Sequence, residues 1–418
     1  MYRSRWTPLF FVLAVAGCAT TPTEMPVPAE PLALPGGIEN PSAWDYFRHG
    51  ERIFEDSPGE AAEAFYWAMR RDPTWATPIF ARRLALFLVD DYLFGEYLSG
   101  SRRALRNPYV QQLDSLYLRA LKLNPFLDRR LDARALKELW RLELIMRLQR
   151  EYPGAPVGEI EMAVGNAVEQ YAQRASDRFK GMLAHGEGRF RQAAAHYGSA
   201  LEDDPDDIDL LARRATVLFR SGRHEAAIEH LRMAIAELRE QDEDELQRVY
   251  YSKAMYLHAI GLVHEDLGDR SAARDAYAEA LQEDLSYHPA HVRLAELALA
   301  AGDTMTAVSE MRLAAEIAPD EASVLMSYGR LLEATGQLAE AEATFRHVTE
   351  VEPLFAAPCV RLARVLDRQD RPGPAVAAYR LFLERAAHDE SGLPEARARL
   401  QELEEALATG TAAAGGSP

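Results

Sequence analysis

A pattern with a fixed period runs through the second half of this 418-residue chain. Six alanines recur at intervals of 34, 46, 34, 34 and 34 residues: Ala193, Ala227, Ala273, Ala307, Ala341 and Ala375. Four residues after each alanine comes a large apolar side chain: Tyr197, Leu231, Tyr277, Met311, Phe345 and Tyr379. Five residues before each stands a glycine or, in the last unit, an aspartate: Gly188, Gly222, Gly268, Gly302, Gly336 and Asp370. Such a period predicts a stack of one repeated structural unit rather than several globular domains.

Each unit predicts two helices that pack against one another. The phased glycine ends the first helix, because glycine adopts positive φ without steric cost. The alanine allows close approach of the second helix, and the large residue on the same helical face fills the groove between the two helices. The first helix carries a small residue in each unit: Gly181, Ala215, Gly261, Ala295, Gly329 and Ala363. The pattern therefore predicts an all-α fold.

This pattern resembles the tetratricopeptide repeat. The resemblance covers six units between residues 174 and 389: 174–207, 208–241, 254–287, 288–321, 322–355 and 356–389. A 12-residue insertion at 242–253 accounts for the longer interval, and we expect it to lengthen the adjoining helices or form a loop. Lys180 and Arg214 depart from the family pattern, which usually has an apolar residue there. The resemblance implies a right-handed superhelical solenoid whose first helices line a concave groove for peptides or proteins.

The rest of the chain after residue 41 shows the repeat pattern less clearly. Residues 42–173 are expected to be a divergent helical region with degenerate repeats, because Ala61, Phe65 and Ala68 match the second helix of a unit. Tyr117 and Ala120 match another unit, but the step from Ala68 to Ala120 is 52 residues, which predicts an 18-residue insertion. Two further segments complete the C-terminus, a capping helix and a disordered tail: 390–408 and 409–418.

The first residues are arranged like a targeting signal. A basic start precedes an apolar run of 11 residues, Trp6–Ala16, which is too short to span a bilayer. Small residues then precede Cys18. This order resembles the signal peptide and lipobox of bacterial lipoproteins, which implies a signal peptide at 1–17 and acylation of Cys18. Since the next residue, Ala19, is not aspartate, the resemblance further implies an outer membrane location, facing the periplasm.

The segment 18–41 is predicted to be a lipidated tether. It contains six prolines and few charged or aromatic residues, which favours an extended conformation. At ~3.1 Å per residue, such a segment would reach about 70 Å from the bilayer. An ordinary signal peptide with an incidental cysteine is the alternative interpretation.

Composition excludes several classes of function. The net charge of −18, which becomes −20 when cleavage removes Arg3 and Arg5, argues against a nucleic-acid partner. Cys359 falls at a packing position, so we expect a core side chain and no disulfide. The histidines lack zinc-site spacing, and the aspartates of 203–209 lack the glycine and glutamate of a calcium loop and are expected to cap a helix. We therefore predict no metal, no cofactor, no small-molecule substrate and no enzymatic activity.

The candidate binding site is a set of arginines at groove-facing positions. Arginine binds carboxylates in bidentate fashion, so the set predicts a site for an acidic or C-terminal peptide. Its members are Arg293, Arg330, Arg361, Arg364 and Arg368. The alternative is local pairing at i, i+3, as between Arg364 and Asp367 or Arg330 and Glu333.

Three hypotheses of function follow from the sequence. The leading one is a lipid-anchored, non-enzymatic adaptor that recruits envelope proteins or peptides. The second is an enzyme or enzyme subunit with a site in 42–173, whose charged residues form no recognisable constellation: Asp90, Asp91, Glu96, Arg102 and Arg103. A deep pocket with converging polar groups there would favour the second hypothesis. The third is a scaffold that self-associates.

Overall fold

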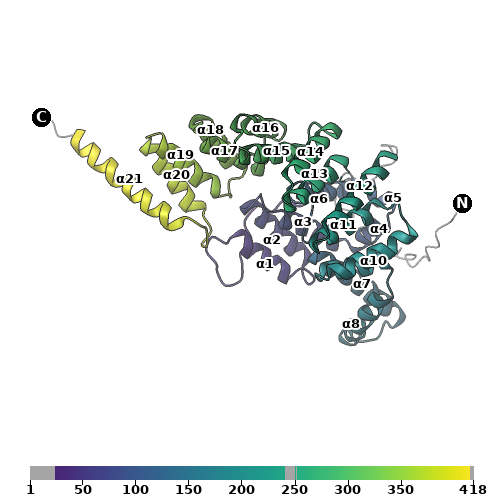
Figure 1. Cartoon of the computed structure of the whole chain (residues 1–418). Helices are drawn as coiled ribbons and strands as arrows, with labels where there is room; N and C mark the ends of the chain where they lie inside the picture. Colours follow the sequence, from purple (N-terminus) through teal and green to yellow (C-terminus); the bar gives the residue numbers. More distant parts are fainter. Residues whose placement is uncertain (1–23, 241–249, 251, 415–418) are drawn as a thin grey trace.

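The repeat region is built from six pairs of antiparallel helices (Figure 1). A computed structural model describes residues 24–240, 250 and 252–414, and every regular element in these ranges is a helix. The six pairs are α9 (Asp177–Gly186) and α10 (Phe190–Asp203), α11 (Ile208–Arg220) and α12 (His224–Glu240), α13 (Lys253–Asp266) and α14 (Arg270–Glu283), α15 (His288–Ala300) and α16 (Thr304–Ile317), α17 (Ala322–Ala334) and α18 (Leu338–Val351), and α19 (Ala357–Arg368) and α20 (Pro372–Arg385). Each pair lies within one predicted unit, apart from a one-residue difference at the start of α13, so the predicted all-α solenoid is confirmed.

The phased small and large residues meet as predicted. A Cβ added to Gly329 would lie 2.6 Å from the ring of Phe345, and one added to Gly261 would lie 2.2 Å from Tyr277. Both rings are fully buried. The glycines after the first helices have positive φ, as at Gly336 (80°), and Asp370 takes the same role with φ 59° in the last unit. A small residue on the first helix therefore accepts the large residue of the second, which fixes the distance between the two helices.

The 12-residue insertion lies mostly outside the described residues. Helix α12 has 17 residues, whereas every other second helix of a unit has 14. The lengthening of the helix before the insertion is thus confirmed. Tyr250, within the insertion, is buried, and Ser252 caps α13 by accepting a hydrogen bond from the N–H of Met255 at 3.3 Å.

The region 42–173 contains two more pairs of the same kind. Gly50 of α1 faces Phe65 of α2, with 2.7 Å between the ring and the position of an added Cβ. The second pair, α3 and α6, is interrupted by the short helices α4 and α5, which occupy the predicted insertion. The long helix α7 and its neighbour α8 follow. Helix α8 packs around a small hydrophobic core that is separate from the main one. These helices are α1 (Ala43–Arg52), α2 (Pro58–Arg71), α3 (Ala76–Val89), α4 (Asp91–Leu98), α5 (Arg102–Leu105), α6 (Pro108–Leu123), α7 (Arg130–Glu151) and α8 (Val157–Arg174).

These N-terminal helices pack against the repeat region along most of its length. Near the start of the repeats, Phe126 stacks on Phe219 with 4.1 Å between ring centroids. Further along, Arg119 forms an ion pair with Glu321 at 3.3 Å. At the last unit, the guanidinium of Arg71 donates to the backbone carbonyl of Arg385 at 2.7 Å. The chain is therefore not an open superhelix, because its first helices also contact the last repeat.

The proline-rich segment is docked on this body, so the prediction of a free tether is wrong for its described part. The backbone N–H of Met25 donates to Oε1 of Gln112 at 3.1 Å, and Arg82 donates to the carbonyl of Pro26 at 2.5 Å. Leu34 is buried, and Leu32 packs against the same core. Prolines keep the segment extended, and its carbonyls therefore remain available to side chains of the body.

The C-terminal helix α21 (Leu393–Ala414) caps the last repeat, as predicted, but it is longer than expected. Ala396 and Leu403 are buried in the core of the final repeats. Arg399 holds Asp367 of α19 with two contacts of 2.8 Å. Residues 409–414 continue the helix, which corrects the prediction of a disordered tail for that part. Among the described residues, no helix combines the length and the hydropathy that crossing a membrane requires.

Candidate partner-binding surface

The inner positions of the first repeats are covered by the chain itself. Phe219 of α11 stacks on Phe126. Arg213 is held between Asp209 at 2.8 Å and Asp132 of α7 at 3.4 Å. Burial alone would lower the pKa of Arg213, but the carboxylates of Asp209 and Asp132 raise it above its usual value. His185 is also buried, so these positions offer no free surface to a partner.

A small polar cavity lies between α3, α7 and the first repeats. Arg83 forms a buried ion pair with Asp114 at 2.7 Å, and Tyr97 also donates to Asp114 at 3.0 Å. On the opposite wall, Arg129 pairs with Asp132 at 3.1 Å. The cavity has about 50 Å³, which is room for a few water molecules. Ligand pockets typically have ~300–1,000 Å³, so this cavity does not provide the deep pocket that the enzyme hypothesis requires.

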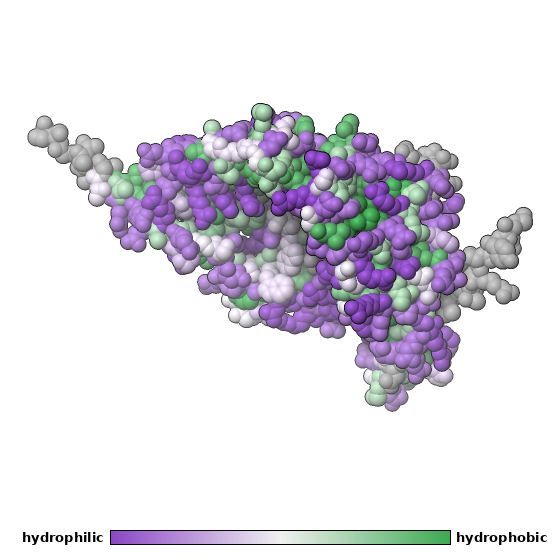
Figure 2. Space-filling model, viewed as in Figure 1, coloured by the Kyte–Doolittle hydropathy of each residue, from purple (hydrophilic) through white to green (hydrophobic). Residues whose placement is uncertain are grey.

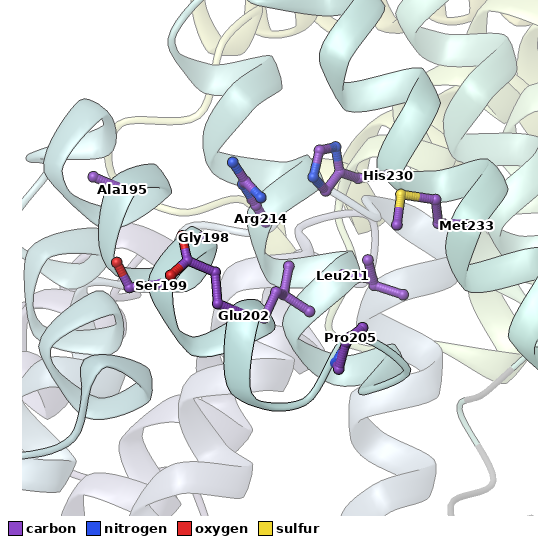
Figure 3. A pocket seen from close by; sticks show the side chains of 10 residues that line it. Ala195, Gly198, Ser199, Glu202, Pro205, Leu211, Arg214, His230 and Met233 are labelled. Carbon is purple, nitrogen blue, oxygen red and sulfur yellow. The ribbon is translucent and has the colours of Figure 1, made fainter.

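A larger and more open pocket of about 370 Å³ lies between α10, α11 and α12 (Figure 3). Its distinctive side chain is Arg214, which stands where the family pattern has an apolar residue. The guanidinium occupies space that Gly198 leaves, since an added Cβ there would lie 3.0 Å from Nη2. His230, on another wall, is bonded through Nδ1 to the carbonyl of Ala226 at 2.8 Å. Glu202 also lines the pocket, so side chains of both charges face it.

The predicted arginines lie on α15, α17 and α19, and three of the five are paired. Arg293 contacts Glu265 of the preceding repeat and Glu296 at 2.5 Å. Burial alone would lower the pKa of Arg293, but the carboxylates of Glu296 and Glu265 raise it. One repeat on, Arg361 pairs with Glu333 at 3.3 Å, and Arg368 donates to the carbonyl of the same residue at 3.0 Å. Pairing between successive repeats therefore neutralises most of this wall.

The two local pairs proposed as the alternative do not form. Asp367 is held by Arg399 of the capping helix rather than by Arg364. Glu333 is held by Arg361 rather than by Arg330. Arg330 and Arg364 are consequently exposed, and neither forms a hydrogen bond or ion pair with the described part of the chain. They stand 34 residues apart, at the same position of successive repeats. Figure 2 shows that the surface is hollowed between the later repeats and the helices α1–α3.

The residues considered as metal ligands have other roles in the structure. Asp207 caps α11 by accepting from the N–H of Leu210 at 3.0 Å, which confirms the capping prediction. His258 is buried, and burial chiefly lowers its pKa to about 3. His291 is bonded to Glu310 at 2.7 Å. Both histidines are buried within the helical body.

One group of potential ligand atoms joins the two ends of the solenoid. It is formed by Asp45 of α1 with His388 and Asp389, which follow α20. Nε2 of His388 contacts Oδ2 of Asp45 at 2.8 Å, and the backbone N–H of His388 donates to the carbonyl of Asn40 at 3.1 Å. The same oxygen of Asp45 accepts from Oγ of Ser42 at 2.8 Å and completes the cap of α1. These contacts give the cluster a structural role, because they link α1 to the segment that follows α20.

Comparison with sequence families agrees with the helix pairs. Two sequence models of the tetratricopeptide repeat match, one over residues 184–249 and the other over 258–322 and 292–353. The chain contains tetratricopeptide repeats. No curated protein matches its sequence.

Solved tetratricopeptide-repeat structures resemble parts of the chain at low sequence identity. The C-terminal part of a repeat protein from Cytophaga hutchinsonii is 15% identical, with a TM-score of 0.42, and covers 55% of this chain and 86% of its own. PilF of Pseudomonas aeruginosa is 18% identical, with a TM-score of 0.39 and coverage of 56% and 98%. YrrB, described as having an unusual peptide-binding site, is 17% identical, with a TM-score of 0.35 and coverage of 46% and 93%. Tetratricopeptide-repeat proteins are generally modules that bind proteins or peptides, and this function is the one that the family supports here.

Proposed function

We propose that this protein is a non-enzymatic adaptor whose binding site is the open inner surface of the last three repeats. The observation that carries the proposal is the pair Arg330 and Arg364. They are exposed and unpaired within the described residues of a chain whose net charge is −18, while their neighbours are tied to carboxylates. The partner would be an acidic segment of an envelope protein.

The chemistry of the two arginines supports an acidic partner. A guanidinium forms two parallel hydrogen bonds with a carboxylate, and such charge-assisted bonds are stronger than neutral ones. Glu296, which lies within electrostatic range of Arg330, is already bound to Arg293 at 2.5 Å. Two arginines in the same register on successive repeats would therefore hold two acidic groups of one extended peptide.

The proposed adaptor is anchored through acylated Cys18 to the outer membrane and faces the periplasm. This part of the proposal comes from the lipobox resemblance, and residues 1–23 lie outside the described structure. Substituting Cys18→Ala should leave the protein unacylated and release it from the membrane fraction. A variant that remains bound to the membrane and is processed normally would contradict the lipoprotein assignment.

Crosslinking mass spectrometry on intact cells tests the binding site. The double variant Arg330→Glu and Arg364→Glu should lose a partner that the wild-type protein captures, because each reversal places a carboxylate opposite the partner's acid. Loss of two charge-assisted contacts predicts a decrease in affinity of at least ~100-fold. A matched control changes two exposed arginines outside this surface, Arg191→Glu and Arg397→Glu.

The outcomes separate the hypotheses. A partner that both double variants retain would place the binding site elsewhere on the protein. A captured partner that is a second copy of the chain would support the self-associating scaffold instead. Equal loss in both double variants would show a general effect of charge, not a site on the later repeats.

A further inference from the structure

We propose that the exposed arginines around α5 form a docking surface for an anionic lipid bilayer. The surface, here called the α5 arginine cluster, consists of Arg102, Arg103 and Arg106. The proposal rests on the proposed lipid anchor for its biological setting, since the anchor would bring the cluster to a membrane. Its direct test, binding to vesicles, does not depend on acylation.

The charge of this segment is opposite to that of the chain. Between residues 102 and 127 there are five basic residues and one acidic residue, in a protein of net charge −18. The acidic residue is Asp114, which is buried and paired with Arg83. All three members of the cluster are exposed, and none forms an ion pair within the described ranges of the chain. A segment with exposed, unneutralised arginines is suited to phosphate groups, which guanidinium binds in bidentate fashion.

The acidic residues of the preceding helix form no ion pair with the cluster among the described residues. Asp90 caps α4 by accepting from the N–H of Leu93 at 3.0 Å. Asp91 accepts from the N–H of Tyr92 at 2.9 Å, and Glu96 accepts from the hydroxyl of Tyr92 at 3.2 Å. These carboxylates keep their charge but are held on α4 by local bonds. The guanidinium groups on the adjoining α5 therefore have no direct carboxylate contact and can bind a phosphate group.

The chain leads from the proposed anchor to this end of the body. The docked segment begins at Met25, whose N–H is bound to Gln112 near the start of α6. Met25 is seven positions after Cys18, which limits the distance from Cys18 to that contact to about 25 Å. Gln112 is six positions after Arg106, and the last four steps rise along α6, which limits that distance to about 15 Å. An acylated Cys18 and the arginines can therefore reach one membrane surface.

Two exposed apolar side chains adjoin the cluster. Val89, at the end of α3, is 54% exposed, and Tyr92, on α4, is 50% exposed. Tyrosine is enriched at the boundary between lipid and water, where its ring lies among headgroups and its hydroxyl remains solvated. Figure 1 draws α4 and α5 at the end of the molecule opposite α21. Docking through the cluster would direct the capping helix away from the bilayer.

Vesicle binding provides the test. The full chain carrying Cys18→Ser, which cannot be acylated at that position, is mixed with vesicles of phosphatidylcholine alone or with 30% phosphatidylglycerol. The cluster variant adds Arg102→Gln, Arg103→Gln and Arg106→Gln. Because each arginine near an anionic surface contributes roughly fivefold to the partition coefficient, the variant should lose about 10- to 100-fold of binding to anionic vesicles. Binding to neutral vesicles should not change, since the predicted signal peptide at 1–17 is present in both proteins.

Two further variants make the result specific. Replacing all three arginines by lysine keeps the charge and should retain most of the binding. Removing three exposed arginines from other helices, with Arg191→Gln, Arg270→Gln and Arg397→Gln, lowers the net charge equally and should have little effect. Equal loss in the scattered and cluster variants, or no loss in the cluster variant, would overturn the proposal.

The outcome is separable from that of the proposed function. Absence of acyl chains on Cys18 in cells would contradict the anchor but leave the vesicle result intact. If the cluster variant binds anionic vesicles normally but loses a protein crosslink in cells, the cluster is a protein-docking surface and the lipid proposal is wrong. Circular dichroism of all variants should be unchanged, because the three side chains are exposed.

Discussion

The contact between Gly329 and Phe345 allows a sharp test of how the repeats are held together. A Cβ at Gly329 would meet Cε1, Cζ and Cδ1 of the Phe345 ring at 2.6, 2.8 and 2.9 Å. The ring is fully buried, so it cannot turn away without displacing its neighbours. Overpacking of this kind costs about 1–3 kcal/mol. Alanine in the interior of a helix regains about 1 kcal/mol relative to glycine.

The Gly329→Ala variant should therefore be less stable by up to about 2 kcal/mol, although alanine is the better helix former. Hydrogen exchange with mass spectrometry measures the change directly as faster exchange in α17 and α18. Gly373→Ala is the matched control, because nothing lies within 4 Å of its added Cβ. The control should leave stability unchanged or raise it by a few tenths of a kcal/mol.

A second substitution tests the cause. Phe345→Leu should destabilise the wild-type protein, but it should cost less in the Gly329→Ala background, because the clash with the ring is gone. Slower exchange in Gly329→Ala than in the wild-type protein would refute the argument. Strictly additive effects of the two substitutions would refute it as well.

Three more predictions follow from the contacts at the C-terminal end. Burial alone would raise the pKa of Asp45, but its capping hydrogen bonds and the charge of His388 lower it. Its stabilisation is therefore present above the unfolded pKa near 3.8 and is lost as pH falls through the folded pKa. Asp45→Asn should lower the thermal midpoint at pH 7, and the difference from wild type should shrink as pH falls below 3.8. Burial raises the pKa of the Cys359 thiol, so iodoacetamide should modify it only on unfolding. Arg399→Ala removes both bonds to Asp367 and should speed hydrogen exchange in α21 several-fold, consistent with ~1 kcal/mol for a partly exposed pair.

Each of these predictions has an opposing result. A constant difference between Asp45→Asn and wild type from pH 3 to 7 would show that the carboxylate charge is not the cause. Alkylation of native Cys359 at the rate of a free thiol would contradict its burial. Unchanged exchange in α21 of the Arg399→Ala variant would mean that Leu403 and its apolar neighbours hold the helix without the ion pair.

The units of this protein were predictable because their contacts are local and periodic. Gly329 and Phe345 are 16 residues apart, and the same pair of positions recurs at a constant spacing. One helix pair therefore predicts the next, including the positive φ of Gly336. The 18-residue insertion before Ala120 was also visible as a break in that spacing, although its fold into α4 and α5 was not.

The docked N-terminal segment could not be predicted in the same way. Its composition is that of a tether, and its contacts are single events between distant residues. Met25 reaches Gln112, and Phe126 reaches Phe219, without any period that marks the partner. The C-terminal extension of α21 was missed because a run rich in alanine and glycine favours both a helix and a loose tail.

The sequence by itself determined the helix pairs, their phase and the presence of arginines on the first helices of the later units. The tertiary structure alone decided which of these arginines remain open. Whether Glu333 meets Arg330 or Arg361 depends on the rotation of α17 relative to α19, and Asp367 is withdrawn by Arg399 from a helix that the repeat pattern does not include. The physical reason is that helix formation depends on neighbours within a turn, whereas ion pairing depends on distances that accumulate over the whole stack of repeats.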